Sequence, residues 1–599
     1  MRIIIDLQGI QSLGNTSRGI GRYSRSLIKS LIKNSSEDHF ILVANSLLKD
    51  IKAEFFKELT HENSNVSYIK WSGIGPSNFS DSTNSLRFKL AENIRSYCFS
   101  KLNADVILIT SFFDGYHDNA VLPININYDL PPVFCIVHDL IPFIHPKDYL
   151  DKDIIYKKFY LKMIDEICKV NFFLTNSRST ATELFSNLPI DEKKVFNISS
   201  GCDQRVFNQK SVNTEINFRN IPKKYILFCG AMDIRKNVRR LIIAYSLLSK
   251  EIQHEYKLVF VGKLTSFEVK QLKIWVEEFG INTDSILVLG YVNDYELAEL
   301  YRKCSLFIMP SIHEGFGLPI IEAMNCGAPV VGSDITSIPE VIGMKEAMFN
   351  PNDVKSISNV IHLALTNEDF QRKLKENAYN RSKLFSWDNS AIKALDIFRS
   401  LLVNQEGKKS VESYSIFKNQ IINICNELQT HQLTDVDISR LSSCIDLIDL
   451  QINSLNKFNR TDNFLSWRIE GPFDSNYSLA LLNREYVLSL LKLSRKVKIS
   501  ITEGNGDYDP DIDFLKGKDE IYKLYLDSIN TKYTSSIVSR NLYPPRVNKM
   551  SGSFNMIHAY GWEETQFPLE WSYSFNKHLD CITVMSDFVK KILIDNGVS

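Results

Sequence analysis

Short apolar runs alternate with helical periodicity over the first two thirds of the chain. In residues 1 to about 205, each run is a continuous apolar stretch, as expected for strands covered on both faces. The segments between the runs have apolar residues three or four positions apart, as in Tyr23, Leu27, Ile28, Leu31 and Ile32. This alternation predicts a doubly wound parallel sheet. The expected strands are residues 3–5, 40–43, 106–109, 133–137 and 172–174.

The same alternation starts again near Lys223. The strands expected there are residues 225–229, 258–261, 286–289, 306–309 and 329–331, again separated by helices. We therefore predict an α/β protein with two Rossmann-like lobes, at residues 1–205 and 206–402. A ligand is expected in the cleft between them, because ligands of such sheets bind beyond the carboxyl ends of the strands.

Residues 403–463 have a different pattern. Apolar residues recur there at three- and four-residue spacing, which predicts an amphipathic helix from Ile438, Leu441, Ile445, Ile448 and Ile452. A partner helix is expected from Ile416, Phe417, Ile421, Ile424 and Leu428. We interpret the region as a helical linker. A helix for oligomerisation or for binding a partner protein is the alternative.

A third unit, at residues 464–599, repeats features of the first. Residues 580–590 match residues 170–180 in type, since each is an apolar run that ends in a serine-containing turn and continues as a helix. Each also follows a segment with a histidine, His138 in the first unit and His558 in the third. We interpret the third unit as a Rossmann-like first lobe of a second, incomplete module. The sequence ends at Ser599, so we expect either a fragment or a chain that finishes with a single lobe.

The composition narrows the class of protein. The 599 residues include 70 Lys plus Arg and 70 Asp plus Glu, and this zero net charge gives no sign of a nucleic-acid-binding protein. The ten cysteines form no C-x-x-C pair, and Asp6 interrupts the first apolar run too early for a signal peptide. No apolar window is long enough to span a membrane. We expect a cytoplasmic protein, with peripheral association at the inner membrane face or with a partner protein as a further option.

The stretch from Ser311 to Met324 carries the strongest chemical signal. The apolar run at 304–310 is expected to be a buried strand, which leads through a glycine-rich turn into a helix. Free backbone N–H groups at the start of a helix bind anions. Glu314 precedes this helix and Glu322 lies within it. The segment can therefore hold a diphosphate, with one carboxylate toward the group at each end, which fits a nucleotide-sugar.

Two glycine-containing segments follow the first strands of the two lobes. In the second lobe, Gly230 opens a turn with Arg235 and Lys236, which are suited to neutralising a leaving diphosphate. In the first lobe, Gly19 and Gly21 form a matching loop, where the missing Cβ permits close approach of the backbone to a ligand. A solvated Arg-Lys pair and an ordinary tight turn are the alternative interpretations.

His138 and Asp139 follow the expected strand at 133–137, where ligand contacts concentrate in such folds. His138 can donate a hydrogen bond to a sugar hydroxyl or a phosphate, with Asp139 orienting it, and a structural histidine is the alternative. No His–Cys spacing fits a metal. Of two Asp-x-Asp segments, we expect the one at 151–153 at a helix start and the one at 511–513 in a surface turn. We therefore predict metal-independent chemistry.

Together these segments resemble the retaining GT-B glycosyltransferases of family 4. The resemblance rests on Gly19 to Gly21, His138-Asp139, Arg235-Lys236-Asn237, Glu314 to Pro319, Glu322-Ala323 and Gly327 to Val331. It covers residues 1 to about 400 in full, and residues 464–599 as a first lobe only. Residues 467–473 and 562–564 resemble segments of mannosyltransferases that assemble polysaccharides.

The resemblance implies a GT-B fold and a metal-independent hexosyltransferase that keeps the anomeric configuration and uses no cofactor. It implies that Glu314 faces the transferred hexose, that Glu322 binds the ribose, and that Arg235 and Lys236 bind the phosphates. Many members carry an arginine near Ala231, a role that Arg235 would take. We therefore expect Glu314, His138, Arg235 and Lys236 to be the catalytic residues. The other substrate contacts expected are Gly19, Gly21, Asp139, Gly230, Asn237, Gly315, Phe316, Gly317 and Leu318.

We therefore expect transfer of mannose from GDP-mannose to a growing surface glycan or lipid-linked glycan, as in the O-antigen of lipopolysaccharide. UDP-glucose or another nucleotide-sugar is the alternative donor. A nucleotide-sugar-binding module without activity is a different class, and the retained Lys236, Glu314 and Glu322 argue against it. A hydride-transferring Rossmann enzyme is not favoured, because G-x-G-x-x-G with a downstream acid does not follow the first strand.

Overall fold

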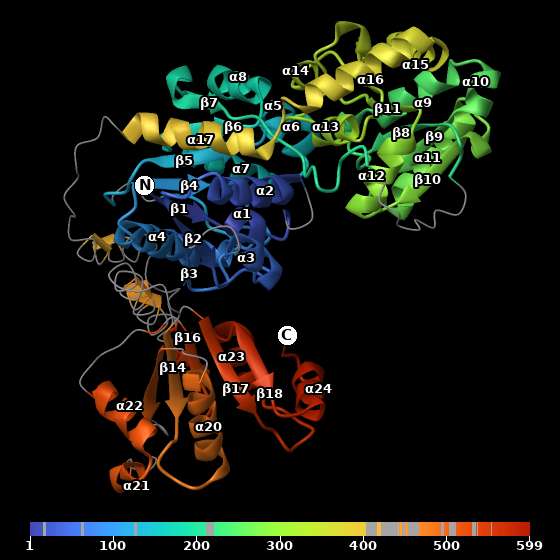
Figure 1. The fold of residues 1–599 in the computed structure, drawn as a ribbon. Helices are drawn as coiled ribbons and strands as arrows, with labels where there is room; N and C mark the ends of the chain where they lie inside the picture. The colour runs from blue at the N-terminus through green and yellow to red at the C-terminus, as the bar shows by residue number, and fades with distance from the viewer. Residues whose placement is uncertain are drawn as a thin grey trace.

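Three parallel β-sheets follow one another along the chain (Figure 1). The computed structural model describes residues 1–15, 19–60, 65–124, 128–210, 221–402, 466–492, 496–501, 511–529, 535, 537–552 and 554–598, and single residues between 416 and 452. Among these residues, no helix has both the length and the apolar character needed to cross a membrane. The predicted α/β class with doubly wound parallel sheets is confirmed.

The first sheet has seven strands in the order β3-β2-β1-β4-β5-β6-β7. Successive residues of its central strands point to opposite faces, so Ile4 lies in one hydrophobic cluster while Ile3 and Ile5 lie in another. Its strands are β1 (Arg2–Asp6), β2 (His39–Asn45), β3 (Val66–Trp71), β4 (Val106–Ile109), β5 (Val133–Val137), β6 (Phe172–Thr175) and β7 (Val195–Asn197). Because both faces are covered by helices, the central strands are apolar without interruption, as the sequence indicated.

Helices from distant parts of the sequence cover this sheet. The face of Ile3 and Ile5 packs against α2 (Gly19–Lys33) and α17 (Trp387–Leu402), which returns from the second lobe (Figure 1). The opposite face packs against α4 (Ser85–Lys101) and α7 (Ile154–Ile167). The shorter helices of this lobe are α1 (Gln8–Gln11), α3 (Ala53–Thr60), α5 (Ile141–Ile144), α6 (Pro146–Tyr149) and α8 (Arg178–Asn187).

The second sheet has six strands in the order β10-β9-β8-β11-β12-β13. They are β8 (Tyr225–Cys229), β9 (Lys257–Val261), β10 (Ile286–Gly290), β11 (Leu306–Met309), β12 (Val330–Ser333) and β13 (Met348–Phe349). Its helices are α9 (Val238–Ser246), α10 (Lys250–Glu255), α11 (Ser266–Glu278), α12 (Asp294–Lys303), α13 (Leu318–Asn325), α14 (Ile338–Ile342), α15 (Val354–Thr366) and α16 (Glu368–Ser382). All five strands expected from the sequence are present, within one or two residues of their predicted bounds.

The third sheet repeats the strand order of the centre of the first. Its order β15-β14-β16-β17-β18 corresponds to β2-β1-β4-β5-β6. Its elements are β14 (Ser466–Gly471), α20 (Ser478–Lys492), β15 (Lys496–Ile501), α21 (Ile512–Lys516), α22 (Asp519–Ile529), β16 (Ile537–Arg540), β17 (Phe554–Tyr560), α23 (Leu569–His578), β18 (Cys581–Val584) and α24 (Asp587–Asp595). The serine-containing turns also match, since Ser177 and Ser586 each cap the following helix by accepting a backbone N–H.

Described residues of the linker pack on the first lobe. Phe417 and Ile448 belong to the same hydrophobic cluster as α4, and the hydroxyl of Tyr97 donates to Asp449 at 2.9 Å. The side chain of Gln451 accepts the N–H of Lys70 at 2.9 Å and donates to its carbonyl at 2.8 Å, so it pairs with the edge strand β3. The predicted linker positions Ile421, Leu428 and Ile438 lie outside the described residues.

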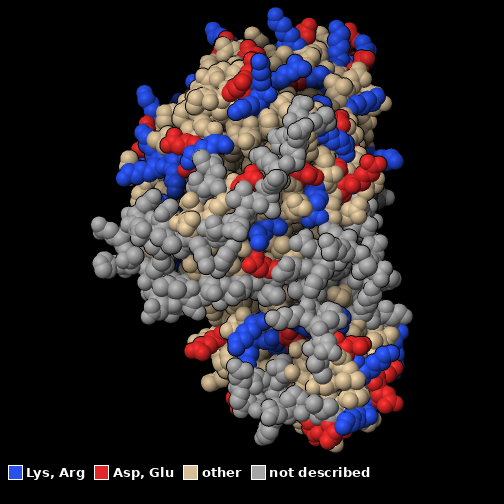
Figure 2. Space-filling view, turned by 90° about the vertical axis from the view of Figure 1, so that its left-hand side faces the viewer, with Lys and Arg blue, Asp and Glu red and all other residues tan. Residues whose placement is uncertain are grey.

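The charged surface matches the balanced composition. Figure 2 shows basic and acidic side chains interspersed over the face that it presents, without a large area of one sign among the residues drawn in colour. The residues drawn in colour on that face therefore show no electrostatic footprint for nucleic acid.

Candidate active site

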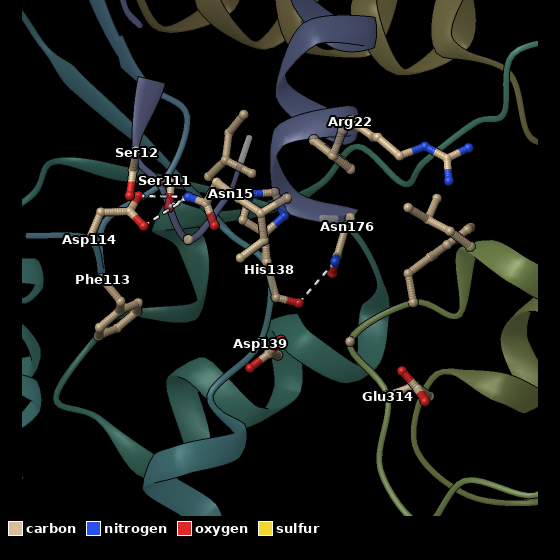
Figure 3. Close-up of a pocket in the computed structure, with 18 of the residues that line it drawn as sticks. Ser12, Asn15, Arg22, Ser111, Phe113, Asp114, His138, Asp139, Asn176 and Glu314 are labelled. Carbon is tan, nitrogen blue, oxygen red and sulfur yellow. Dashed lines mark hydrogen bonds between the residues drawn. The ribbon is translucent and has the colours of Figure 1, made fainter. Parts of the chain in front are cut away.

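A cavity of about 670 Å³ lies between the first and second lobes. Its wall is built from segments that follow β1, β4 and β5 of the first sheet and β8 and β11 of the second. These are the carboxyl ends of parallel strands, where ligands of such folds bind. Figure 3 shows that the side chains come toward this space from both lobes. The cleft predicted from the sequence is therefore present.

Glu314 is held between two cations. It follows β11, its side chain is 8% exposed, and its carboxylate accepts hydrogen bonds from Lys236 Nζ at 2.6 Å and Arg235 Nη1 at 2.8 Å. Burial alone would raise the pKa of Glu314, but Lys236 and Arg235 lower it to about 2. Glu314 is therefore a carboxylate at neutral pH. Arg235 and Lys236 lie in a short 3₁₀ turn that Asp233 caps, directly after β8.

Glu322 lies inside α13 and bridges to the first lobe. Its carboxylate accepts Arg22 Nη2 at 2.9 Å and the hydroxyl of Tyr301 at 3.3 Å. Burial raises the pKa of Glu322, and the Arg22 charge opposes that shift. As predicted, one glutamate precedes the helix and the other lies within it. Glu314 is therefore paired with Arg235 and Lys236, whereas Glu322 is paired with Arg22.

His138 follows β5 and carries a neutral ring. Its Nε2 lies 3.0 Å from the carbonyl oxygen of Thr110, which assigns the ring proton to Nε2, and burial lowers its pKa to about 4. Tyr23 packs edge-on against the ring, with centroids 4.8 Å apart. The carboxylate of Asp139 accepts the N–H of Ile141 at 3.1 Å, and burial raises its pKa. The hydrogen bonds described for Asp139 do not join it to His138.

The two lobes touch at Gly315. A Cβ added there would collide with the carbonyl oxygen of His138, so only glycine permits this approach. The hydroxyl of Thr180 donates to the carbonyl of Gly315 at 3.2 Å, again across the two lobes. Phe316, Gly317 and Leu318 also line the cavity, at the start of α13.

Three predicted contact residues are not among those that line the cavity in the described part of the chain: Gly21, Gly230 and Asn237. Asn237 donates to the carbonyls of Pro310 at 3.0 Å and Pro351 at 2.7 Å, so its amide ties strand ends together. Gly21 lies in the first turn of α2, which corrects the expected glycine loop. Gly19 begins that helix and faces Leu318, and Arg18 lies outside the described residues.

The two Asp-x-Asp segments both start helices. Asp153 accepts the N–H groups of Ile155 and Tyr156, as predicted for the start of α7. Asp511 accepts two N–H groups in the same way, so the expectation of a surface turn at 511–513 is wrong. An aspartate at such a position satisfies free backbone donors and needs no metal to explain it.

Several residues that the sequence did not single out line the cavity. Arg22 directly follows Gly21. Its ion pair with Glu322 could be recognised only from the folded structure. Asn15 and Asp114 lie beyond the ends of β1 and β4. Asp114 follows an apolar run, and this position in the sequence could have identified it as a candidate site residue. His313, next to Glu314, is not among the described lining residues, but it joins the lobes through contacts with His145 and Glu183 at 3.0 Å each.

Comparison with known proteins connects this geometry to a family. Residues 210–381 match the family model of glycosyl transferases group 1. The chain is 33% identical over 430 residues to a serotype-specific mannosyltransferase WbdA of Escherichia coli, a match that covers 70% of this chain and 50% of WbdA. It is 40% identical over 177 residues to O-antigen chain mannosyltransferase B of Escherichia coli, covering 30% of this chain and 46% of the relative.

A solved structure supports the fold. The sucrose-phosphate synthase of Thermosynechococcus elongatus superposes with a TM-score of 0.51 at 17% identity, covering 68% of this chain and all of that one. At this identity the likeness shows the fold alone, which is the GT-B arrangement of two lobes. The chain spans about half the length of the WbdA proteins that it matches.

Proposed function

The chain belongs to the group 1 glycosyl transferases, and from this membership we propose that it transfers a hexose from a nucleotide-sugar to a glycan acceptor. The observation that carries the proposal is Glu314, which precedes α13, is ion-paired with Arg235 and Lys236, and lines the same cavity as His138. Arg235 and Lys236 place two cations at the cavity, where they can bind a diphosphate, and Asp233 lies 3.6 Å from the guanidinium of Arg235.

Each group in this arrangement has a role in the proposed transfer. Arg235 and Lys236 stabilise the charge that develops on the leaving diphosphate, the largest protein contribution to such a reaction. Glu314, ionised at neutral pH, accepts hydrogen bonds from hydroxyls of the hexose. Glu322 accepts hydrogen bonds from the ribose hydroxyls after Arg22 has moved away from its carboxylate. The reaction keeps the anomeric configuration and uses no metal, because two side chains already supply the charge that a metal would bring.

The donor we favour is GDP-mannose. Support comes from the relatives, since the matched WbdA and O-antigen proteins are named as mannosyltransferases. The acceptor is then a growing surface glycan or a lipid-linked glycan. UDP-glucose is the alternative donor. The reaction is proposed for the cytoplasm, where peripheral association with the membrane would give access to the acceptor, and the nine cysteines described as free thiols fit a reducing compartment.

For the third unit, we propose the first lobe of a second module of the same type. The matching strand order and the two serine caps support this proposal. The domain boundaries proposed are 1–205, 206–402, 403–463 and 464–599, with α17 as the helix that crosses back to the first lobe.

A donor-turnover experiment tests the proposed activity. The full chain is incubated with GDP-mannose, UDP-glucose and other nucleotide-sugars, and released nucleotide and glycan products are measured by mass spectrometry. We expect turnover of GDP-mannose, and a loss of about 100-fold or more in Glu314→Gln, because a preorganised charge at the reacting group is removed.

The matched control is Glu376→Gln, since Glu376 lies exposed on α16 away from the cavity. It should keep parental turnover. Equal background release by the parent and Glu314→Gln with every donor, together with retained nucleotide-sugar binding, would identify a binding module instead of an enzyme.

A further inference from the structure

One side of the cavity is aromatic and acidic. We call Asn15, Phe113, Asp114, Tyr156 and Tyr160 the aromatic-acidic wall, and all five line the cavity. Phe113 and Asp114 follow β4, while Tyr156 and Tyr160 lie on α7. In Figure 3, Asn15, Phe113 and Asp114 gather on the side of the cavity away from Arg22 and Glu314. The wall therefore faces the part of the site assigned to the donor.

Tyr160 has a buried hydroxyl with no hydrogen-bond partner in the described part of the chain. The residue is 2% exposed, and its ring stacks on Phe113 with centroids 4.6 Å apart and planes 12° apart. The side-chain oxygen of Asn176, a residue that is 6% exposed and also lines the cavity, has no partner either. Buried polar groups are normally paired, so both atoms indicate a polar ligand that completes them.

Asp114 is fixed in one orientation. Asn15 Nδ2 donates to both carboxylate oxygens, at 2.8 and 2.9 Å, which leaves other lone pairs of the carboxylate for a ligand. The neighbouring loop is held in turn, since Ser12 Oγ donates to Asp118 at 2.7 Å. Burial, with a smaller contribution from the charge of Asp118, raises the pKa of Asp114 to about 7. Held in this position, the carboxyl group of Asp114 can bond to a ligand hydroxyl in either protonation state.

The cations described at the cavity lie elsewhere. Arg22 pairs with Glu322, and Arg235 and Lys236 pair with Glu314. A phosphate or carboxylate on the ligand would therefore meet Asp114 without a described counter-charge. Aromatic faces with fixed hydrogen-bonding groups suit a pyranose, which has an apolar C–H face and hydroxyl groups at its rim.

We infer that the aromatic-acidic wall binds the terminal sugar of the glycan acceptor and that this sugar is a neutral pyranose, with Asp114 accepting from one hydroxyl and Tyr160 bonding to another. This inference rests on the proposed function, because the donor must occupy the opposite side of the same cavity. It adds the chemical class of the acceptor and the residues that select it.

The test compares Asp114→Asn and Tyr160→Phe with the parent, using methyl α-mannoside and methyl α-glucoside as neutral acceptors. Mannose 6-phosphate and methyl α-glucuronide serve as anionic ones. We expect the acceptor KM to rise at least tenfold in Asp114→Asn and about threefold in Tyr160→Phe. Each substitution removes a protein group that bonds to an acceptor hydroxyl, and a site built around such a hydrogen bond loses affinity when one partner is removed. The melting temperature of each variant, compared with that of the parent, shows that the variants fold. Tyr379→Phe, an exposed tyrosine on α16, is the matched control.

Unchanged acceptor KM in both variants, or a preference of the parent for an anionic acceptor, would overturn the inference and leave the proposed function standing. If the parent turns over no donor, the proposed function fails. The wall is then tested by saturation-transfer NMR with methyl α-mannoside. In that experiment, loss of the signal in Asp114→Asn supports a pyranose site, and equal signals in parent and variant overturn it.

Discussion

At the scale of single residues, the charge of Glu314 is set by its two neighbours. Its pKa of about 2 lies below the usual 4.5, so the folded state favours the ionised form. The stability from this preference is present above pH 4.5 and is lost as the pH falls toward 2. The positions of Lys236 and Arg235 therefore predict an acid-dependent contribution to stability that belongs to this site.

We predict that Glu314→Gln unfolds at a lower temperature than the parent at pH 7, because Lys236 and Arg235 lose their buried partner. Removing one member of a buried ion pair costs on the order of 3–5 kcal/mol. The difference should be constant from pH 8 to about 5 and shrink below pH 4.5, as followed by differential scanning calorimetry of the full chain. A difference that is absent at pH 7, or that does not shrink in acid, contradicts the assigned ion pairs.

Residues that join the two lobes were the hardest to predict. The sequence signals for Glu314 and Glu322 are local, because strand, turn and helix follow one another between Leu306 and Asn325. The partner of Glu322 is Arg22, 300 positions away, and no local pattern links them. The wall with Asp114 and Tyr160 depends in the same way on two segments that meet only after folding.

At the scale of elements, continuous apolar runs were reliable, and an edge strand of mixed composition was missed. β4, β5, β8 and β11 have the predicted bounds because both of their faces are buried. β3 was not predicted, since it is an edge strand whose sequence mixes Ser67 and Lys70 with apolar residues. One face of such a strand is only partly covered, so its composition resembles that of a loop.

The turn between β11 and α13 gives a prediction at this scale. We expect Gly315→Ala to reduce transfer at least tenfold with little change in the melting temperature of the full chain. The added Cβ meets the carbonyl oxygen of His138 and pushes the turn away from the first lobe. A shift of about 1 Å in a catalytic group is sufficient for a large loss of rate.

Small-angle scattering and donor turnover would measure the effect of Gly315→Ala. Gly517→Ala is a suitable control, because the nearest atom to its added Cβ lies 4.0 Å away. Parental turnover in Gly315→Ala would mean that the close approach of the lobes is not needed for the reaction.

At the scale of the whole molecule, many polar contacts join the first two lobes, and few described contacts join the third unit to them. Across the first two lobes, Glu340 accepts the N–H of Arg178 at 2.8 Å, in addition to the contacts at the cavity. The described contacts of the third unit with the first lobe include the ion pair of Lys70 with Asp580. The cavity should therefore depend little on the third unit.

His558 tests this independence. It stands in β17 where His138 follows β5, but it is 1% exposed, and Ser539 and Asn483 contact its two ring nitrogens at 2.8 Å each. Tyr486 also stacks on it, with centroids 4.2 Å apart. We predict that His558→Ala destabilises the third unit by roughly 3 kcal/mol or more, because a packed ring and two buried hydrogen bonds are lost. Calorimetry should show one transition of the full chain moving to lower temperature while donor turnover stays within twofold. A parallel loss of donor turnover would instead mean that the third unit supports the cavity, and the ion pair between Lys70 and Asp580 would then be the first contact to examine.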